Sequence, residues 1–221
     1  MSVIKRAVRH SLLRRLSPQA MLIAAALLAP PAFPLTLVEQ GEPRAAVVIG
    51  QEAAPCVPVA AEELRRHIEA MSGAELPLVE AAEGDTVTSL AQGRNLILIG
   101  SSSLTRELGV DTEALPSDGF VIRSLPGCLV VCGNDADRFS MNYDWVPASA
   151  GTLYGAYRVL EGVGVRWFYP GELGTVIPQQ ETVEIPELNV RDAPYFPYRF
   201  GGYGRDLMTW YRRVGFGGDR D

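Results

Sequence analysis

The sequence is poor in histidine: its 221 residues include only two, His10 and His67. Zinc sites built on two histidines, and nucleophile triads with histidine as the base, both depend on this residue. His10 lies in a leader-like N-terminal stretch, so the rest of the chain excludes a two-histidine metal site and disfavours a histidine-based triad. We interpret His67 as a solvent-exposed residue on the charged side of a helix.

Lysine is nearly absent as well, since Lys5 is the only one and every later basic residue is arginine. The full chain carries 20 basic and 26 acidic residues, a formal net charge of −6. Five of the basic residues and none of the acidic ones lie in residues 1–32, so the rest carries 15 against 26, or −11. Nucleic acids and anionic membranes require a basic surface. The charge therefore argues against either as the main partner.

No hydrophobic run reaches the roughly 20 residues that a membrane-spanning helix needs. The run Ala20–Ala29 is shorter, follows a basic start without acidic residues, and precedes small residues and prolines. This order is typical of a secretory signal peptide. We predict a signal peptide over residues 1–32, cleavage near Ala32, and export to the periplasm or the extracellular space. An uncleaved membrane anchor and an amphipathic leader are the alternatives.

Cysteine is scarce, with Cys56, Cys128 and Cys132 as the three examples. Cys128 and Cys132 lie four residues apart in a predicted strand, so they share a face but are separated by roughly 13 Å. The Cα atoms of a disulfide lie within about 7 Å of each other. We favour buried free thiols. A bond from either residue to Cys56 requires the fold to bring the two together.

The familiar nucleotide-binding motifs are missing. Gly50, Gly100 and Gly133 each end an apolar strand, as glycines do in nucleotide-binding turns. None of them belongs to a G-x-G-x-x-G or P-loop pattern. The sequence therefore predicts no nucleotide cofactor.

The acidic residues do not form a recognisable site either. Asp135, Asp137 and Asp144 share a polar loop but lack EF-hand spacing, so we expect no metal. Glu62 and Glu63 are adjacent on a predicted helix, and adjacent helical residues do not face one another as a glycosidase acid–base pair must. We interpret both glutamates as solvated surface charges.

Apolar periodicity predicts two main helices. Leu64, Ile68 and Met71 recur at helical spacing in residues 59–71, and Gly73 is free to adopt the left-handed conformation that ends a helix. The second helix covers residues 152–161. Strands are predicted at residues 45–49, 76–79, 95–99, 119–123, 128–132, 165–169 and 182–185, a short helix at 104–108, and polar loops at 81–94 and 133–150.

The order of these elements combines βα units with one hairpin, formed by residues 119–123 and 128–132. The combination predicts an α/β (α+β) sandwich, in which a mixed β-sheet carries two main helices on one face. Pro77 favours an edge position for the strand at residues 76–79, because proline cannot donate a hydrogen bond to a neighbouring strand.

After Pro186 the sequence becomes proline-spaced and extended, which is typical of a linker between domains. Residues 199–203 resemble a strand that enters a new domain, and residues 207–214 have the character of a helix. A strand and half a helix cannot bury a core of their own. We therefore interpret residues 191–221 as a linker followed by the start of a truncated domain.

Segments spread over most of the chain carry a resemblance to a known domain family. They are Pro58–Pro77, Leu96–Gly100, Asp118–Phe120, Leu129–Val131 and Gly151–Gly174, the last being the most specific. With them, roughly residues 36–203 resemble the β-hexosaminidase domain 2-like family. This is the non-catalytic domain that precedes a (β/α)8 barrel in family 20 hexosaminidases, family 67 α-glucuronidases and exported bacterial glycoside-hydrolase-like proteins.

The resemblance implies a site at the entry to the barrel, where the family's arginine hydrogen-bonds sugar hydroxyls. Residues 192–199 resemble that entry, so Arg199 is the candidate sugar-binding residue and Tyr203 is a candidate for stacking on a sugar. Barrel sites gather at the C-terminal ends of strands, and arginine offers five donors in a fixed fork. A salt bridge that anchors the linker is the alternative for Arg199. For Trp167 and Phe168 we favour packing in the core or between domains.

These inferences divide the chain into a signal peptide (1–32), an accessory domain (33–190) and a linker with the first strand of a truncated barrel (191–221). The predicted function is that of a non-catalytic accessory domain of an exported carbohydrate-active hydrolase. The missing barrel is the expected intramolecular partner and the part that contacts carbohydrate. We expect no catalytic residue, metal or cofactor in this chain, an inactive fragment, and a glycosidase as the parent protein. The alternative is a stand-alone glycan- or partner-binding module from a truncated gene, which binds through residues 133–150 and 167–169.

Overall fold

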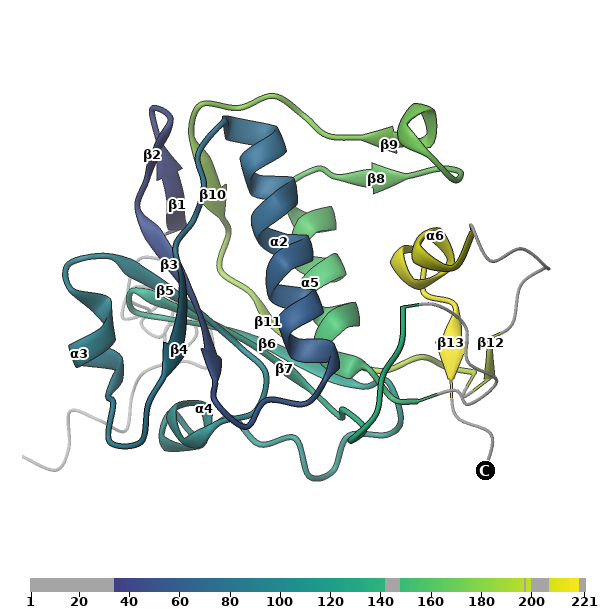
Figure 1. Ribbon diagram of the computed structural model, residues 1–221, viewed down its shortest axis with the longest axis horizontal. Coiled ribbons are helices and arrows are strands. Elements are labelled where there is room, and N and C mark those ends of the chain that lie inside the picture. The colour runs from purple at the N-terminus through teal and green to yellow at the C-terminus, as the bar shows by residue number, and fades with distance from the viewer. Residues whose placement is uncertain (1–33, 142–147, 197, 200–206, 219–221) are drawn as a thin grey trace, which may run out of the picture. The chain divides into compact units, whose positions relative to one another are not determined.

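A mixed β-sheet flanked by helices organises the chain (Figure 1). The computed structural model describes residues 34–141, 148–196, 198–199 and 207–218. No helix among them is long and apolar enough to cross a membrane. The elements are, in chain order, β1 (Leu35–Glu39), β2 (Glu42–Pro43), β3 (Ala45–Gly50), α2 (Cys56–Ser72), β4 (Leu78–Ala81), α3 (Val87–Ala91), β5 (Asn95–Ile99), α4 (Ser103–Glu107), β6 (Phe120–Leu125), β7 (Cys128–Gly133), α5 (Gly151–Gly162), β8 (Arg166–Trp167), η2 (Glu172–Gly174), β9 (Thr175–Val176), β10 (Val183–Ile185), β11 (Asn189–Asp192), β12 (Tyr198–Arg199), α6 (Met208–Arg213) and β13 (Gly217–Gly218).

The main sheet has the strand order β11-β6-β7-β5-β3-β4. The strands β3, β4, β5 and β7 run parallel, whereas β6 and β11 pair antiparallel with their neighbours. Parallel strands are covered on both faces, which is why β3 and β5 are continuous apolar runs. The predicted mixed sheet and the β6–β7 hairpin are confirmed. So is the edge position of the strand next to Pro77, although β4 begins only after that proline.

Alternate residues of the central strands belong to two separate hydrophobic clusters. Val47 of β3 and Ile97 of β5 lie in one cluster, whereas their neighbours Val48 and Leu98 lie in the other. Successive side chains of a strand point to opposite faces. The two clusters therefore cover the two faces of the sheet.

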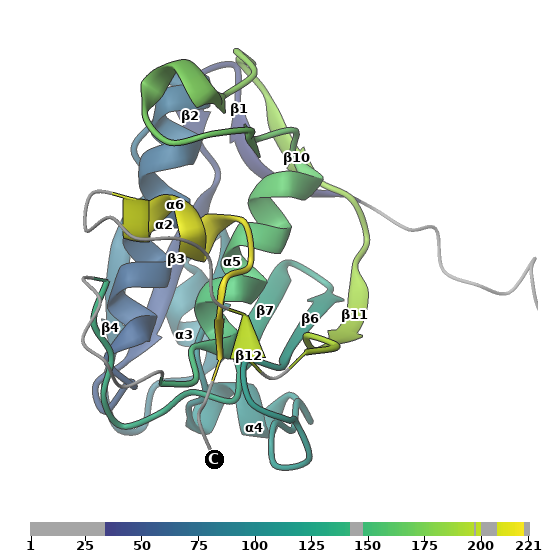
Figure 2. The same ribbon diagram turned by 90° about the vertical axis from the view of Figure 1, so that its right-hand side faces the viewer.

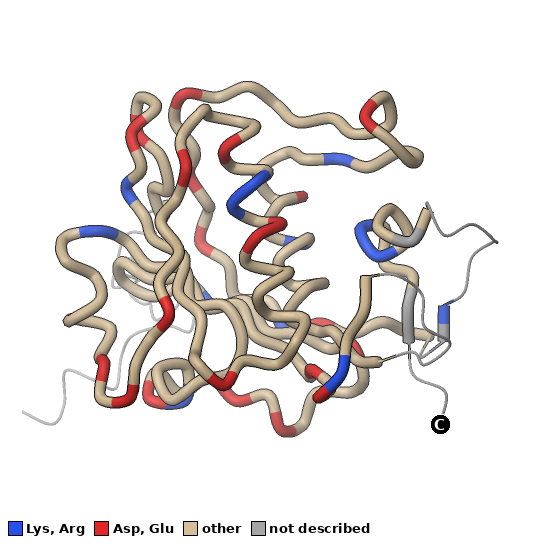
Figure 3. The backbone as a smooth tube through the Cα atoms, in the orientation of Figure 1, with Lys and Arg blue, Asp and Glu red and all other residues tan. Residues whose placement is uncertain are grey.

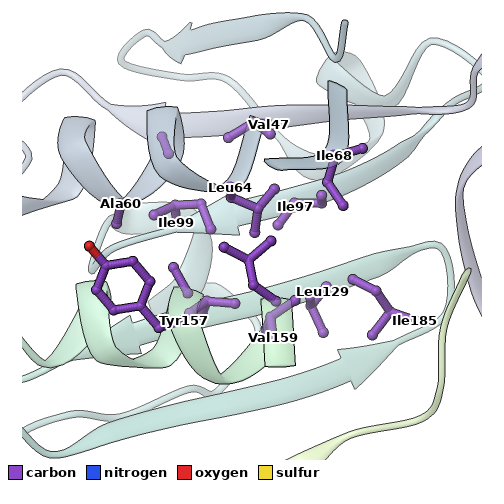
Figure 4. Packing of buried hydrophobic residues seen from close by; sticks show 14 of the residues in the cluster. Val47, Ala60, Leu64, Ile68, Ile97, Ile99, Leu129, Tyr157, Val159 and Ile185 are labelled. Atoms are coloured by element: carbon purple, nitrogen blue, oxygen red, sulfur yellow. The ribbon is translucent and has the colours of Figure 1, made fainter. Parts of the chain in front are cut away.

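The helices α2 and α5 lie side by side on the first face (Figures 1 and 2). Leu64 of α2 and Leu160 of α5 are fully buried, and Figure 4 shows the packing of this layer against Ile97 and Leu129 of the sheet. The prediction of two main helices on one face is confirmed. The first helix starts earlier than predicted because Pro58 is tolerated in the first turn, where its missing N–H has no partner to lose.

The second face carries the short helices α3 and α4. Residues 81–94, predicted as a polar loop, contain α3, so that prediction is wrong. Thr86 Oγ1 accepts from the Ser89 N–H at 3.1 Å, and Ser89 Oγ accepts from the Thr86 N–H at 3.0 Å. This reciprocal capping box satisfies backbone donors at the start of the helix. A five-residue helix is too short to reveal itself by periodicity.

All three cysteines are buried free thiols, as predicted. Cys56 belongs to the cluster under α2, whereas Cys128 and Cys132 belong to the cluster on the other face of the sheet. Because the sheet separates them, neither of the strand cysteines can pair with Cys56.

Shorter strands surround the main sheet. β10, predicted within one residue, pairs with β1 in the three-stranded sheet β10-β1-β2, whose other two strands were not predicted. The strand predicted over residues 165–169 is shorter: only β8 pairs, with β9. Gly171, at φ 88°, makes the turn that follows. A left-handed conformation suits glycine because it has no Cβ.

The extended segment interpreted as a linker needs a correction. Its first residues form β11, which pairs with β6 along Asn189–Asp192 and completes an edge of the main sheet. The helix predicted at residues 207–214 is confirmed as α6. Further along, β12 pairs with β13.

Candidate functional site

Asp118 joins three parts of the fold. The residue is fully buried and has the left-handed φ of 58°, which aspartate tolerates better than most residues. Its Oδ1 accepts from the Ala150 N–H at 2.8 Å, and its own N–H donates to Ser149 Oγ at 2.7 Å. Its Oδ2 accepts from Arg199 Nη2 at 2.8 Å. Asp118 thus ties the start of α5 and the β12 strand to the entry of β6.

Arg199, the predicted sugar-binding residue, is engaged within the protein. Besides the pair with Asp118, its Nε donates to the Gly215 carbonyl at 2.5 Å and its Nη1 to the Phe196 carbonyl at 2.9 Å. Its guanidinium also lies over the Tyr154 ring, 5.6 Å from the centroid. This is the anchoring salt bridge given as the alternative for Arg199. A sugar contact stays a prediction, and Tyr203 lies outside the described residues.

Glu63 forms a second buried ion pair. Its carboxylate accepts from Arg213 Nε and Nη2 at 2.9 and 3.1 Å, and from Arg66 at 2.8 Å. Burial by itself raises the pKa of Glu63, but the hydrogen bonds and charge of Arg213 outweigh it and hold that pKa below its ordinary value. The interpretation of Glu63 as a solvated charge is wrong. α6, which lies 150 residues away in sequence, covers this part of the α2 surface.

His67, one turn further along α2, is buried rather than exposed, so its interpretation is wrong as well. Its Nδ1 lies 2.7 Å from the Glu63 carbonyl oxygen, which can only accept, so Nδ1 carries the proton. The ring meets the Trp167 ring edge-on at 5.4 Å. Burial lowers the pKa of His67. Trp167 packs in the core, as predicted. Phe168 is exposed, so it does not pack in the core, and of its two predicted roles only packing between domains stays a prediction.

Further contacts hold α6 and β13 against α5. Trp210 Nε1 donates to the Trp167 carbonyl at 3.2 Å, Tyr154 OH donates to the Phe216 carbonyl at 2.7 Å, and Arg212 Nη1 donates to Tyr154 OH at 3.0 Å. Both views place α6 beside the α2–α5 pair (Figures 1 and 2). We call the described residues 198–218 the C-terminal segment and residues 34–192 the domain body. Acidic positions predominate along the body, whereas α6 carries basic ones (Figure 3).

An aromatic cavity of about 480 Å³ opens between the domain body and the C-terminal segment. Its walls come mainly from α5, β8, residues 192–196, Arg199 and residues 213–215. Its aromatic lining consists of Phe120, Tyr154, Tyr157, Trp167, Phe168, Tyr195 and Phe196. Its charged lining consists of Asp118, Arg158, Glu161, Arg166, Asp192, Arg199 and Arg213. The volume and the mixture of apolar walls with a few polar groups are typical of small-molecule sites. Of this lining, sequence analysis named only Arg199, Trp167 and Phe168 as individual candidates.

A second pocket, of about 350 Å³, lies at the carboxyl ends of the parallel strands. Ligands of α/β sheets gather at such ends. Here, however, Glu52, Glu113 and Asp135 line the pocket, and their charge opposes a phosphate group. Gly133 serves packing, since a Cβ there would come within 2.3 Å of the Gly151 backbone.

Asp135 caps the start of α5. It accepts from the Thr152 N–H at 2.8 Å and from Thr152 Oγ1 at 2.5 Å. Burial raises the pKa of this carboxyl. Within the described ranges no three histidine, cysteine or acidic side chains are grouped to hold a metal ion. Asp144 and the middle of the predicted loop 133–150 lie outside those ranges.

The fold of the chain is similar to that of segments of glycoside hydrolases of known structure. A family GH115 4-O-methyl-α-glucuronidase with specificity for decorated arabinogalactans is similar at a TM-score of 0.52 and 23% identity, over 75% of this chain and 19% of that enzyme. The GH20 β-N-acetylhexosaminidase of Streptomyces coelicolor (TM-score 0.45) and the β-hexosaminidase of Streptomyces plicatus (0.43) are each 10% identical over 77% of this chain and 25% of theirs. The chain therefore spans a quarter or less of these enzymes. Its sequence matches no protein-family model and none of the curated proteins.

Proposed function

We propose that the chain is a non-catalytic accessory domain of an exported carbohydrate-active hydrolase, whose chemistry resides in a separate barrel. The observation that carries the proposal is the fold, which the chain shares with a segment amounting to 19% of a GH115 α-glucuronidase. A fold by itself does not determine a function.

The carboxylates of the aromatic cavity support a non-catalytic role. A glycosidase needs two carboxyl groups that are free to meet the substrate. Asp118 is bonded to Arg199 and the Ala150 N–H. Glu161 lies 3.5 Å from Arg158, and Asp192 accepts from the Ala193 N–H. Asp118 therefore has both oxygens engaged, whereas Glu161 and Asp192 each use one oxygen for a partner.

The C-terminal segment supports an accessory role of a specific kind. Arg199 and Arg213 hold it to carboxylates in two distant parts of the domain body, Asp118 and Glu63. Two separate attachment points fix the direction in which a segment runs, not only its position. In this proposal the domain sets the orientation of the barrel that begins beyond residue 199. The leader of residues 1–32 supports export.

The coding DNA beyond the codon for Asp221 tests the proposal. A frame that continues for roughly 250 residues with alternating strands and helices, the size of a (β/α)8 barrel, is the expected result. A stop codon directly after Asp221 would contradict the accessory role. The non-catalytic part is tested separately, because turnover of aryl glycosides by the purified chain, lost in the Glu161→Gln variant, would contradict it.

A second candidate function is a stand-alone module that binds glycans or a partner. The aromatic cavity favours it, because the cavity is built entirely from residues of this chain. If the reading frame continues past Asp221, the chain can serve both functions. If a stop codon follows Asp221, only the binding module agrees with that result.

A further inference from the structure

We propose that the aromatic cavity is a binding site for a neutral saccharide. The inference deepens the second candidate function by naming a ligand class, and it does not need a catalytic domain. It rests on three properties of the cavity: the exposed aromatic rings at its mouth, the pairing of most charges along its walls, and the hydrogen-bonding groups that its salt bridges leave over.

Exposed aromatic rings gather at the mouth of the cavity. Tyr195 is 91% exposed, Phe168 68% and Phe196 64%, and all three line the cavity. Among the described residues, every exposed large hydrophobic side chain except Leu78 lies within residues 168–176 or at 195–196. Exposed aromatic rings gathered around one cavity mark an interaction site. The flat apolar faces of these rings suit the C–H-rich faces of pyranose rings.

Most charges that line the cavity are paired: the lining has four arginines and three carboxylates, and Arg213 pairs instead with Glu63, which lies outside the lining. Arg199 meets Asp118 at 2.8 Å, and Arg213 meets Glu63 at 2.9 Å. The third pair, Arg158 with Glu161, is looser at 3.5 Å. The two charged residues left over have opposite signs: Arg166 donates only to backbone carbonyls, and Asp192 accepts from a backbone N–H. A site whose charges are mostly paired gives little advantage to an anionic ligand over a neutral one.

The polar groups at the rim offer both donors and acceptors. Arg166 uses Nη1 for the carbonyls of Glu161 and Val165, so its other nitrogens have no recorded acceptor within the described chain. Glu161 likewise engages one carboxylate oxygen with Arg158. A sugar hydroxyl is donor and acceptor at once, whereas guanidinium only donates and carboxylate only accepts. Apolar ring faces next to both kinds of polar group therefore favour a saccharide over a lipid or an anion.

The test is titration calorimetry of the purified full chain with defined sugars. The probes are xylotetraose, cellotetraose and N,N′-diacetylchitobiose, which are neutral, and trigalacturonate, which is acidic. We expect saturable binding of at least one neutral probe and weaker binding of trigalacturonate. Absence of binding to all three neutral probes at millimolar concentration overturns the proposal, and so does binding of trigalacturonate alone.

Variants locate the site. Phe168→Ala and Tyr195→Ala each remove an exposed ring and should weaken the binding of the neutral probe about tenfold. Leu173→Ala is the matched control, since Leu173 is 90% exposed and close to Phe168 in sequence but does not line the cavity. All three variants should keep the wild-type urea midpoint. Unchanged binding in both ring variants, or an equal loss in the control, overturns the assignment to this cavity.

The outcome is independent of the coding-DNA experiment. A long reading frame without saccharide binding would leave the accessory role standing and remove this site. Saccharide binding with a stop codon after Asp221 would leave this site standing and remove the accessory role.

Discussion

The domain body is stabilised mainly by aliphatic packing, whereas the C-terminal segment is held by arginines. In the body, buried side chains such as Leu64 and Ile97 fill one contiguous layer between helices and sheet. In the segment, Arg199, Arg212 and Arg213 reach back to acceptors on the body. The body is thus a cooperative core, and the segment is attached to it by these arginine contacts together with the packing of Trp210 and Val214 against the core.

The difference matters for how each region responds to change. Removal of a core side chain leaves a cavity that the whole layer shares, so the entire fold loses stability. Loss of one arginine contact leaves the core intact and frees a stretch of chain locally. Substitutions in the two regions should therefore differ in kind as well as in size.

The largest effect is expected in the body. Leu64→Ala should lower the free energy of unfolding by about 2–5 kcal/mol, because it removes buried methyl groups and leaves a cavity. Urea unfolding followed by circular dichroism measures it. Leu173→Ala, at an exposed position, should change the same quantity by no more than about 0.5 kcal/mol. An equal loss of unfolding free energy in the two variants would contradict the assignment of Leu64 to the core.

A smaller effect is expected at the ion pair between the two regions. Glu63→Gln leaves Arg213 without its carboxylate and should cost about 1–3 kcal/mol. It should also speed cleavage by trypsin within the C-terminal segment, as located by mass spectrometry. Glu62→Gln is the matched control, because Glu62 is exposed and pairs only with Arg65. Identical cleavage in the two variants would mean that Glu63 does not anchor the segment.

The pH dependence should be smaller still and should come from His67. Burial lowers the pKa of His67 in the folded protein. The unfolded chain therefore binds a proton first as the pH falls below about 6.5, and stability declines from there toward the lowered pKa. Arg66 and Arg213 act in the same direction as burial, whereas Glu63 opposes them. As the pH is lowered from 7.5 to 5, the urea midpoint of the wild type should decrease, whereas that of His67→Gln should change less. A parallel decline in both proteins would assign the effect elsewhere.

The smallest change is expected from thiol alkylation of the native protein. Burial raises the pKa of Cys128 and of Cys132 to about 12, and it raises the pKa of Cys56 as well. Since the thiolate is the reactive form, iodoacetamide at pH 8 should modify none of them in the folded state. All three should react in urea, as mass spectrometry can count. Rapid labelling of native protein would show that the body opens locally.

Much of the body could be predicted from the sequence because its signals are local. The apolar runs of β3 and β5, the helical spacing of Leu64 and Ile68, and the short connection between β6 and β7 each involve neighbouring residues. The misses were elements with weak local signals. α3 is a single capped turn. β11 is an edge strand, and its residues 189–192 show too little alternation of apolar and polar side chains to be told from a linker.

The site was predictable only in part. The resemblance to a known domain family pointed to Arg199, and the alternative of an anchoring salt bridge was stated with it. Asp118 appeared only as part of a family motif, with no role. The sequence around Glu63 and His67 does not show that both are buried. The amphipathic pattern of a helix indicates its apolar face, but it does not show which distant segments pack against its polar face.

The sequence by itself determined the mixed sheet, the two helices on one face and the free thiols. Those features follow from periodicity and spacing over a few residues, because they depend on interactions between residues that are close in sequence. The tertiary structure alone decided that Glu63 and His67 are buried, that Arg199 pairs with Asp118, and that aromatic side chains from α5, β8 and residues 195–196 meet around one cavity. Each of these depends on contacts between residues that are far apart in the chain, since burial and electrostatics are set by which surfaces come together in space.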